Sequence, residues 1–505
     1  MGRPVIVLRG GHVCDPATGF DGPADVLIDG NTVAAEGAEN SESPENTEVV
    51  DVRGLIVGPG FIDLHSHVHS VAGHWLQALD GVTTALDLEA GLMPIGRAYA
   101  EAAAAGRPLN YGFSASWAAA RAQALLGRVP TASLRETLSL LGDPAWQRSS
   151  SRQELASLLA LLETELAEGA LGIGVLMGYA PRSDPAEFSS VVAVAAAAGV
   201  PAYVHVRELV EADPTTPIDG SEEIAIAAAE TGAALHHCHV NSTSRRHIDR
   251  VLATMDRARA EGSKVTLEAY PYGAGATAIG AVFLAPELLD TRGLRPSNII
   301  VMTTGERVAD VARLRELRRS DPGAPCIVEY MDERDPRDFG YLQRALAFPD
   351  SIVASDAMPV MMPEDARHGE RHGERHGERQ GATWPLPRGA RTHPRTAGSF
   401  TKALRLMVRE SGAWSWPEAF RRCSYLPAEV ISRVAPGARA KGRLSPGADA
   451  DIVVLDPHQV TDLATYRDPT RPAQGVRHLL VGGTFVVRDG ALRPEVRPGR
   501  AVRGV

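Results

Sequence analysis

Val57-Gly-Pro-Gly-Phe-Ile-Asp-Leu-His-Ser-His67 is the segment from which the architecture of this chain can first be inferred. After the Gly58-Pro-Gly60 break, a short apolar run ends in two histidines spaced i, i+2. In a strand this spacing points both side chains to one face, where two imidazoles can hold one divalent metal. A chance pair is the alternative, because the chain has 16 histidines. Side chains at the ends of later strands distinguish the two interpretations.

Seven further apolar segments resemble the one that ends at His67, and Ala- and Leu-rich helical segments follow them. The eight expected strands are Leu55–His67, Val82–Glu89, Leu109–Ser114, Leu171–Leu176, Pro201–Val206, Ala233–Val240, Lys264–Tyr270 and Ser351–Asp356. Eight strands that alternate with helices predict an α/β fold, a parallel (β/α)8 barrel of the TIM type.

The two ends of the chain carry short strand-like runs instead, such as Val5–Leu8 and Asp451–Leu455. We expect residues 1–57 and 431–505 to pair into a small β-sandwich, and residues 58–430 to form the barrel domain. The segment from about 285 to 349 is too long for a simple crossover. It is therefore interpreted as a cap inserted before the last strand.

Composition limits the classes of function. Apolar residues at 44% and charged residues at 23% are typical of an ordinary globular protein, and the net charge of -10 argues against nucleic acid as the main partner. No apolar run reaches the length of a membrane span, and the first residues do not resemble a signal peptide. The four cysteines are scattered, which favours a reduced, cytoplasmic protein, and the lack of a long apolar run argues against a membrane partner.

A tetrapeptide repeat, Arg367-His-Gly-Glu-Arg-His-Gly-Glu-Arg-His-Gly-Glu-Arg-Gln380, is of low complexity. Histidine-rich tracts can bind metal. This tract is charged, punctuated by glycine and without apolar residues, so a mobile surface loop is the preferred interpretation. Its histidines are left out of the candidate site.

Candidate metal ligands stand at the carboxyl ends of five expected strands, where barrel enzymes place their chemistry. The candidates are His65, His67, Glu89, His205, His239 and Asp356. Each alone has a structural explanation, as a helix-terminal carboxylate or a buried core histidine. Their convergence on one barrel end favours a site for one or two divalent metal ions.

The order of these residues resembles the amidohydrolase superfamily, and further motifs resemble its N-acyl-D-amino-acid deacylase branch. The motifs are Gly81-Val-Thr-Thr84, Gly178-Tyr-Ala-Pro181, His205-Val-Arg-Glu208, Tyr270-Pro-Tyr272, Ser355-Asp356, His393-Pro-Arg-Thr-Ala-Gly-Ser-Phe400 and the closing segment 442–457. The resemblance implies an intracellular hydrolase with Zn²⁺ at the barrel mouth, although another divalent metal would suit the same ligands. It also makes Tyr179, Tyr272 and His393 candidate substrate-binding residues.

Several positions depart from the deacylase pattern. The branch carries a metal-binding cysteine after the second strand, where this chain has Glu89 and Ala90, so Glu89 is expected to bridge two metal ions. The branch also carries a lysine that helps to hold the substrate carboxylate, where this chain has Asn241. Asn241 remains a candidate substrate contact, but simple N-acetyl-D-amino acids are expected to be poor substrates. The acidic residue that follows His-x-His in the family is absent as well.

The distribution of lysine excludes another architecture. Lysine occurs only at Lys264, Lys402 and Lys441. Hydantoinases and dihydroorotases of the same fold bridge two metals with a carboxylated lysine on the third or fourth strand. That bridge is not available here, which again favours Glu89 as the residue that bridges two metal ions.

The ligands suggest a division of roles. His65, His67 and Asp356 would hold one metal, and His205 and His239 a second, with Glu89 shared. Asp356 would act as general base toward a metal-activated water. Tyr179 or His393 would polarise the scissile carbonyl, and either Arg207 or Arg395 would hold an anionic part of the substrate. Both arginines have an equally good structural explanation.

Two classes of function follow. The first is a zinc-dependent amidohydrolase that deacylates an N-acyl amino acid or a related small-molecule amide; within this class, hydrolysis of another C–N bond in a specialised biosynthetic pathway is the alternative. The second is a non-catalytic barrel that serves as a scaffold. A scaffold has no need of six ligands, so the enzyme is favoured. A homo-oligomer is left open.

Overall fold

Eight parallel strands, one for each strand expected from the sequence, confirm the predicted (β/α)8 fold class. The protein is described here by a computed structural model that covers residues 5–37, 47–363 and 383–505. The repeat at 367–380 lies outside these residues. The strands of the barrel are β6 (Phe61–Asp63), β7 (Val82–Leu92), β8 (Asn110–Ser116), β9 (Ile173–Leu176), β10 (Ala202–His205), β11 (Leu235–His237), β12 (Val265–Ala269) and β16 (Ile352–Val353).

The chain divides into two units, which are described separately below. Unit 1 consists of Met1–Leu86, Glu101–Gly112 and Ile352–Val502, and unit 2 of Asp87–Ala100, Phe113–Ser351 and Arg503–Val505. Unit 1 thus contains the N-terminal and the C-terminal strands of the chain together with β6 and β16, whereas Arg503–Val505 belongs to unit 2. The domain boundaries inferred from the sequence, at residues 57 and 430, stay a prediction.

The segment Leu55–His67 forms two strands, so the expectation of a single strand is wrong. β5 (Ile56–Pro59) pairs with β17 (Ile452–Leu455), whereas β6 pairs with β7. The break falls where Pro59 offers no backbone N–H and Gly60 packs tightly. A Cβ at Gly60 would lie 2.1 Å from the Thr83 methyl carbon. His65 and His67 follow β6 rather than lying within it.

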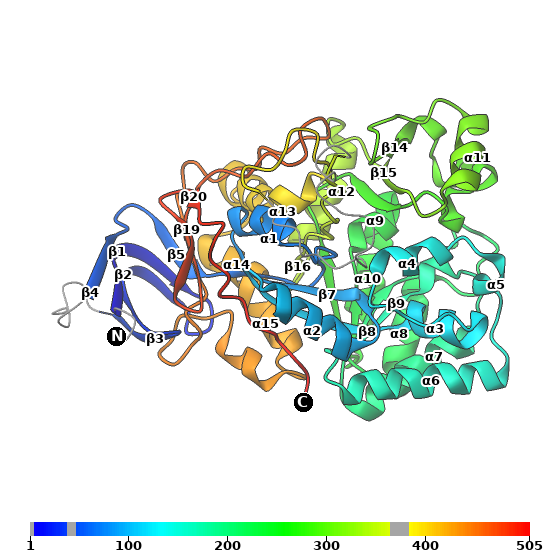
Figure 1. Ribbon diagram of the computed structural model, residues 1–505, viewed down its shortest axis with the longest axis horizontal. Helices are drawn as coiled ribbons and strands as arrows, with labels where there is room; N and C mark the ends of the chain where they lie inside the picture. The colour runs from blue at the N-terminus through cyan, green and yellow to red at the C-terminus, as the bar shows by residue number, and fades with distance from the viewer. Residues whose placement is uncertain (1–4, 38–46, 364–382) are drawn as a thin grey trace. The chain divides into compact units, whose positions relative to one another are not determined.

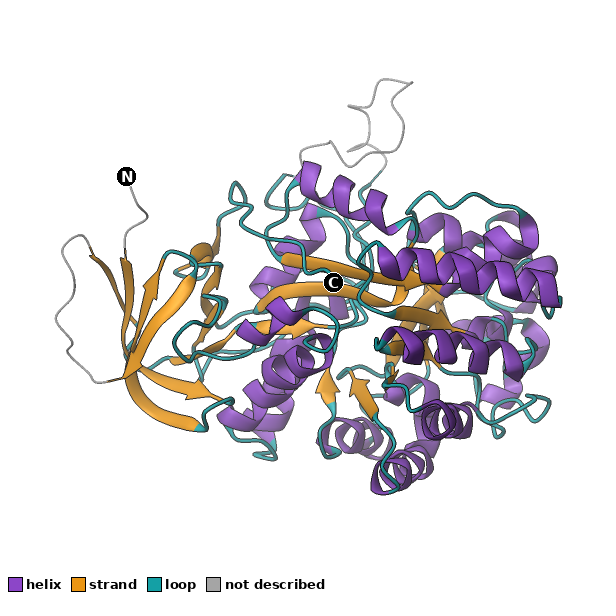
Figure 2. Ribbon diagram, turned by 90° about the horizontal axis from the view of Figure 1, so that it is seen from below, coloured by secondary structure: helices purple, strands orange, loops and turns teal. Residues whose placement is uncertain are grey.

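Nine strands of unit 1 form the sheet of the predicted β-sandwich region. They are β1 (Val5–Asp15), β2 (Phe20–Asp29), β3 (Thr32–Gly37), β4 (Thr47–Asp51), β5, β17, β18 (Val476–Val481), β19 (Thr484–Arg488) and β20 (Ala491–Leu492). The antiparallel pair of β5 and β17 joins the two ends of the chain. Figure 1 shows this closure, because blue β1 and β5 share the sheet with red β19, and Figure 2 shows the strands of this sheet in orange.

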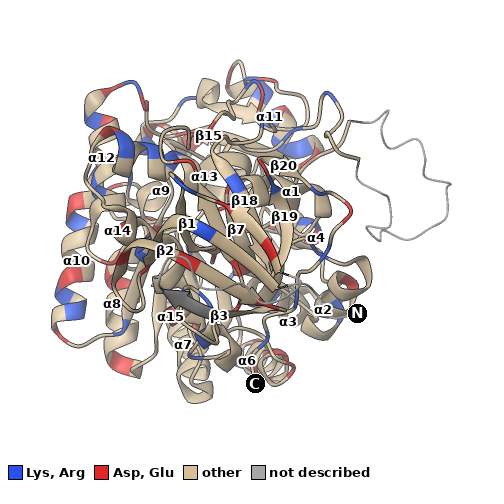
Figure 3. Cartoon of the chain, turned by 90° about the vertical axis from the view of Figure 1, so that its left-hand side faces the viewer, with Lys and Arg blue, Asp and Glu red and all other residues tan. Residues whose placement is uncertain are grey.

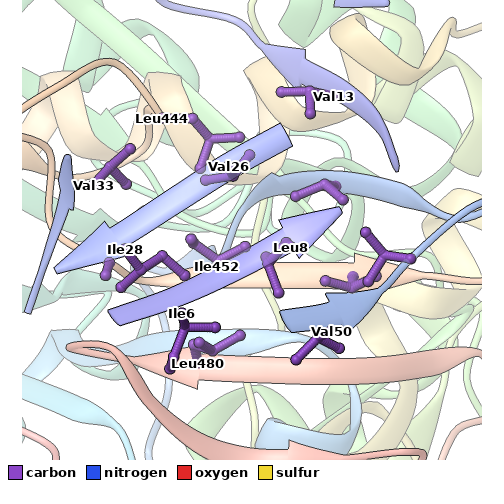
Figure 4. Close-up of a cluster of buried hydrophobic side chains, with 14 of the residues drawn as sticks. Ile6, Leu8, Val13, Val26, Ile28, Val33, Val50, Leu444, Ile452 and Leu480 are labelled. Carbon is purple, nitrogen blue, oxygen red and sulfur yellow. The ribbon is translucent and has the colours of Figure 1, made fainter. Parts of the chain in front are cut away.

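An apolar cluster stabilises this sheet. Alternate residues of β1 and β2, such as Ile6, Leu8, Val26 and Ile28, are buried and point into it, and Ile452 joins them from the other end of the chain (Figure 4). The period of two is what a strand with one buried face requires. Burial of each such side chain contributes roughly 1.5–3 kcal/mol to folding.

Helices follow the barrel strands, as the alternating pattern predicts. In unit 1 they are α1 (Val71–Leu79), α13 (Arg395–Leu404), α14 (Trp416–Phe420) and α15 (Leu426–Ile431). In unit 2 they are α3 (Trp117–Leu126), α4 (Leu134–Leu140), α5 (Pro144–Gln147), α6 (Arg152–Ala167), α7 (Pro185–Ala198), α8 (Gly220–Thr231), α9 (Val240–Ser244), α10 (Ile248–Ala260), α11 (Val311–Ser320) and α12 (Pro336–Ala347). The unit boundary falls within α2 (Ile95–Ala105). None of the helices in the described ranges has the length and apolar character needed to cross a membrane.

Capping residues explain where the helices of unit 2 begin and end. Asp184 accepts a hydrogen bond from the backbone at the start of α7, and Asp219 does the same for α8. Gly199 and Gly232 end these helices at positive φ, which glycine adopts without strain. Between α8 and α10, Arg257 pairs with Glu222 at 3.0 Å, and Figure 3 shows both charge signs interspersed along α10.

A three-stranded sheet of unit 2 lies between the seventh and eighth barrel strands along the chain. Its order is β13 (Ala274–Ala278), β15 (Pro325–Glu329) and β14 (Ile299–Val301), all antiparallel. β14, α11, β15 and α12 fall within the segment from about 285 to 349 that the sequence predicts as an insert, whereas β13 precedes it.

Candidate metal centres

Three candidate ligands of unit 1 lie close together and are called the His65 cluster: His65, His67 and Asp356. The Nε2 atoms of the two histidines are 3.1 Å apart, and each lies about the same distance, 3.5 and 3.6 Å, from Asp356 Oδ1. All three residues are buried. The spacing i, i+2 therefore directs both imidazoles to one place, as expected, even though the residues follow the strand.

A buried carboxylate next to the His65 cluster holds its backbone in place. Asp63 Oδ1 accepts hydrogen bonds from the backbone N–H of His65 at 3.2 Å and of Ser355 at 3.0 Å. Its other oxygen accepts from Gln77 at 2.7 Å and from the Ser355 hydroxyl. Asp63 thus ties the His-x-His segment to the residue before Asp356. This role could not be predicted from the sequence, because Asp63 and Ser355 are 292 positions apart.

Asp356 adopts a strained backbone conformation and has a cationic partner. Its φ is 49°, in the left-handed region that only a few per cent of non-glycine residues adopt. Arg395 Nη2, at the start of α13, lies 2.7 Å from Asp356 Oδ1 and is itself fully buried. His393 precedes it, and its Nδ1 accepts a hydrogen bond from the Arg395 backbone. Arg395 therefore orients the carboxylate that is the candidate base.

Three candidate ligands of unit 2 form the Glu89 cluster: Glu89, His205 and His239. Glu89 Oε1 lies 2.9 Å from His205 Nδ1 and 2.6 Å from His239 Nε2. One ligand atom from each residue lies within 4.8 Å of the others. The two imidazole rings are edge to face, with centroids 4.6 Å apart. Both imidazoles therefore face the same carboxylate oxygen.

His239 is held in place by a second buried carboxylate. Its φ is 33°, and its backbone N–H donates to Glu268 Oε1 at 3.2 Å. The other oxygen of Glu268 lies 3.0 Å from His236 Nε2. His237 points elsewhere, toward the Thr243 hydroxyl, and burial lowers the pKa of its imidazole to about 3. His236 and His237 are therefore supporting or core residues.

An aromatic pair lies beside His205. The Tyr179 ring centroid is 4.8 Å from that of His205, and the Tyr179 hydroxyl shares a 2.8 Å hydrogen bond with Thr277 of β13. Phe283, which the sequence analysis did not select, lies 5.2 Å from Tyr179 and stacks on His205 at 6.4 Å. Only the tertiary fold reveals Phe283, because it comes from a short turn that follows β13.

Arg207 forms an internal ion pair, and its selection as a substrate contact stays a prediction. Its Nε donates to both oxygens of Glu223, at 2.9 and 2.8 Å, and its side chain is fully buried. Nη1 donates to the carbonyl of Pro181 at 2.6 Å. Arg207 thus links α8 to the loop that carries Tyr179.

Asn241 is similarly engaged within the protein. Its Nδ2 donates to the Tyr330 hydroxyl at 3.1 Å and to the Tyr272 carbonyl at 3.4 Å. Its Oδ1 accepts from the Tyr270 backbone at 3.1 Å. Both amide protons are used within the protein, and a direct contact of Asn241 with substrate stays a prediction. Tyr272, 2% exposed, offers its carbonyl rather than its hydroxyl to these contacts.

The donor sets fit zinc. Each cluster combines two imidazoles with one carboxylate, and these nitrogen and oxygen donors are ligands that Zn²⁺ prefers in proteins. Further carboxylates, Asp63 and Glu268, hold the backbone of the ligands from behind, as supporting residues commonly do at metal sites. The sharing of Glu89 between two metals stays a prediction.

Comparison with known proteins agrees with this chemistry. A model of the Amidohydrolase family matches residues 48–487. An N-acyl-D-glutamate deacylase of Alcaligenes xylosoxydans xylosoxydans is 30% identical over 99% of this chain and 96% of its own length. A D-aminoacylase of the same organism is 28% identical over 96% and 95%.

Solved structures give the same result. The crystal structure of N-acyl-D-glutamate deacylase from Bordetella bronchiseptica, complexed with zinc and a phosphonate mimic of the tetrahedral intermediate, is 25% identical with a TM-score of 0.73. The match covers 99% of this chain and 100% of that one. A D-aminoacylase structure, 24% identical over 99% of both chains and with a TM-score of 0.73, shows the same fold.

Proposed function

The chain belongs to the Amidohydrolase family, and we propose that it removes the acyl group from an N-acyl amino acid or a closely related amide. It is a metal-dependent amidohydrolase with zinc as its cofactor and a small-molecule amide as its substrate. The observation that supports the proposal most directly is the presence, at barrel strand ends, of two clusters that each combine two imidazoles with a carboxylate.

We propose that the His65 cluster and the Glu89 cluster each hold a metal ion. When bound, such an ion supplies Lewis acidity and lowers the pKa of a coordinated water toward about 7. His65, His67 and Asp356 present their donor atoms within 3.6 Å of one another, and Glu89 presents one oxygen to both His205 and His239. Little rearrangement of these side chains is needed for binding.

Asp356 is proposed as the general base. It would accept a proton from the attacking water through Oδ2 or Oδ1 and return it to the amine that leaves. Arg395 orients the carboxylate from 2.7 Å, and the positive φ aims the side chain at the two histidines. Tyr179, fixed by Thr277 and by the Arg207-anchored loop, is proposed to donate its hydroxyl to the scissile carbonyl. His393 and Tyr272 remain proposed substrate contacts.

Turnover and metal content together test the proposed function. The zinc-loaded protein should release free amine from a panel of N-acetyl, N-formyl and longer N-acyl derivatives of D- and L-amino acids. Activity should disappear with chelator and return with Zn²⁺. A protein that binds zinc but hydrolyses no amide of the panel would instead support the scaffold, and cleavage of cyclic ureas or imides alone would support the other C–N hydrolase.

Location and assembly are separate questions. We propose a cytoplasmic enzyme, since its four cysteines are buried and widely spaced, and a homo-oligomer is left open. Cell fractionation with an antibody tests the location. Light scattering coupled to size-exclusion chromatography distinguishes an oligomer from a monomer, which would be a single species at 53.7 kDa.

A further inference from the structure

Three metal-binding side chains outside the His65 and Glu89 clusters meet on the first two strands of unit 1, and they are called here the β1–β2 site: His12, Cys14 and Asp21. His12 and Cys14 belong to β1, and Asp21 lies on β2 directly opposite Cys14. The i, i+2 spacing places His12 and Cys14 on one face of the strand. Val13, between them, points to the other face and into the apolar cluster (Figure 4). The strand pair therefore brings an imidazole, a thiol and a carboxylate together.

The three side chains meet at Asp21 Oδ1. His12 Nε2 lies 2.6 Å from this oxygen, and the Cys14 thiol donates to it at 3.4 Å. One donor atom from each residue lies within 4.8 Å of the other two. A tetrahedral zinc ion with bonds of about 2.0–2.3 Å places its ligand atoms roughly 3.3–3.6 Å apart. The distance between sulfur and carboxylate already fits, and the distance between imidazole and carboxylate has to widen by less than about 1 Å.

Solvent reaches the β1–β2 site. The side chains of His12 and Asp21 are 44% and 47% exposed, whereas Cys14 is fully buried. An ion that arrives from solvent therefore meets the imidazole and the carboxylate first, and the sulfur lies within one coordination sphere of both. The two exposed side chains are free to turn as the ion binds. Three protein ligands and one water complete the tetrahedral coordination that Zn²⁺ adopts.

The thiol decides which ion suits the site. Burial, together with the charge of Asp21, raises the pKa of the Cys14 thiol well above its ordinary value, so the metal-free protein keeps its proton. A bound cation offsets the charge of Asp21 and stabilises the thiolate. The sulfur–metal bond then forms as the thiol proton leaves to solvent, and His12 contributes the lone pair of Nε2. Thiolate and imidazole favour zinc, whereas Mg²⁺ and Ca²⁺ prefer oxygen ligands.

We propose that His12 Nε2, Cys14 Sγ and the Asp21 carboxylate form an additional zinc site, separate from the two clusters that serve the proposed reaction. The inference is independent of the proposed function, because it concerns other residues. The ligands come from both β1 and β2, so the ion cross-links the two strands. A ligand that binds only the folded chain stabilises it, and zinc at this site therefore stabilises the nine-stranded sheet without taking part in turnover.

Cobalt absorption of the full-length protein tests the proposal, with Co²⁺ in place of the spectroscopically silent Zn²⁺. The chelator-treated protein is titrated with Co²⁺ while the near-ultraviolet spectrum is recorded. A thiolate-to-cobalt charge-transfer band requires a sulfur ligand, so cobalt that is bound by histidines and carboxylates alone does not contribute to it. We expect a band that corresponds to one sulfur-bound Co²⁺ per chain. Zn²⁺ should abolish the band by displacing cobalt, because thiolate ligands favour zinc.

Variants assign the band to its ligands. Cys14→Ser should abolish it. His12→Gln and Asp21→Asn should each weaken cobalt binding at least about tenfold, since even residues that only support a metal ligand contribute that much. The matched controls are Cys326→Ser, a buried thiol of β15, and His458→Gln, an exposed histidine that follows β17. Both controls should leave the band unchanged.

His12→Gln and Asp21→Asn alter exposed side chains, so they keep the test decisive if Cys14→Ser does not fold. The proposal is overturned if the wild-type protein shows no band, if the band survives in folded Cys14→Ser, or if His12→Gln and Asp21→Asn both bind Co²⁺ within twofold of wild type. Amide hydrolysis by zinc-loaded His12→Gln should equal that of wild type. A protein that shows the band but hydrolyses no amide would refute the proposed function alone.

Discussion

The nine-stranded sheet and the two metal clusters use buried residues in opposite ways. In the sheet, alternate apolar side chains such as Leu8 and Ile452 pack together and leave few polar groups to satisfy. In the clusters, buried carboxylates and imidazoles face one another at 2.6–3.6 Å. The first arrangement stabilises the fold, and the second concentrates ligands at some cost in stability. Substitutions in the sheet should therefore mainly lower stability, and substitutions in the clusters should mainly lower activity.

The reason for positive φ also differs between the nine-stranded sheet and the two clusters. In the sheet, Asp489 and Gly490 both have positive φ because a two-residue hairpin loop between β19 and β20 requires it. His239 and Asp356 also have positive φ, at 33° and 49°, but neither belongs to such a hairpin loop. Strain of this kind persists where surrounding contacts hold a functional side chain in place. Glu268 and Arg395 supply those contacts.

The largest difference between loss of activity and loss of stability is expected for Asp356→Asn. Turnover should fall by about 10³-fold, because asparagine keeps the shape but cannot accept the proton. The protein should still fold, with a smaller relative loss in the free energy of unfolding than in turnover, because asparagine can still accept a hydrogen bond from the buried Arg395. Initial rates with a good N-acyl substrate and urea unfolding of the same preparation measure both quantities. Turnover within a few-fold of wild type would assign the base to another group.

Ile452→Ala should give the converse result. Ile452 is fully buried in the apolar cluster, so its truncation should cost about 3 kcal/mol of unfolding free energy. The kcat per folded molecule should be unchanged. Val49→Ala is the matched control on the same sheet, because Val49 is 44% exposed, and it should cost less than about 0.5 kcal/mol. An equal loss in both variants would mean that this sheet does not depend on its apolar core.

Glu89→Gln tests whether a buried carboxylate of the second cluster acts on metal rather than on the fold. Affinity for one zinc ion should fall on the order of 10–100-fold, and metal content after dialysis should drop by about one equivalent. Equilibrium dialysis with elemental analysis measures this. Glu163→Gln, on the exposed side of α6, should have no effect. Unchanged zinc affinity in Glu89→Gln would make Glu89 a structural carboxylate.

The smallest expected effect concerns Asp80, a buried carboxylate outside the two clusters whose ionisation should change stability but not turnover. It accepts hydrogen bonds from the Phe400 and Thr401 backbone, yet burial raises its pKa to about 7. The folded protein therefore binds this proton more tightly than the unfolded chain, and stability should decline as pH rises from about 4 to 7.

Asp80→Asn removes this titration. Between pH 5 and pH 8, wild type should lose about 2–3 kcal/mol of unfolding free energy relative to the variant, while turnover remains the same. Urea unfolding at both pH values measures the difference. A constant difference across this range would show that Asp80 ionises normally in the folded state.

Local patterns allowed much of the site to be predicted. A strand that ends in a ligand residue is visible in the sequence, and His65, His67, Glu89, His205, His239 and Asp356 are each found near the end of a barrel strand. The boundary of the first strand was missed, because its two halves pair with different partners, β17 and β7. Phe283 and Tyr330 were missed because they come from short elements without a recognisable pattern.

The sequence by itself determined the alternation of strands and helices, the absence of lysine before Lys264, and the kinds of donor available at each strand end. These properties depend on neighbouring residues along the chain. Only the tertiary structure decided which groups meet: Arg207 with Glu223, Asn241 with Tyr330, and Asp63 with the backbone of Ser355. Such pairs join residues that are 16, 89 and 292 positions apart, and their choice depends on how distant strands and helices pack. For that reason the sequence did not reveal that two predicted substrate contacts, Arg207 and Asn241, also have partners within the protein.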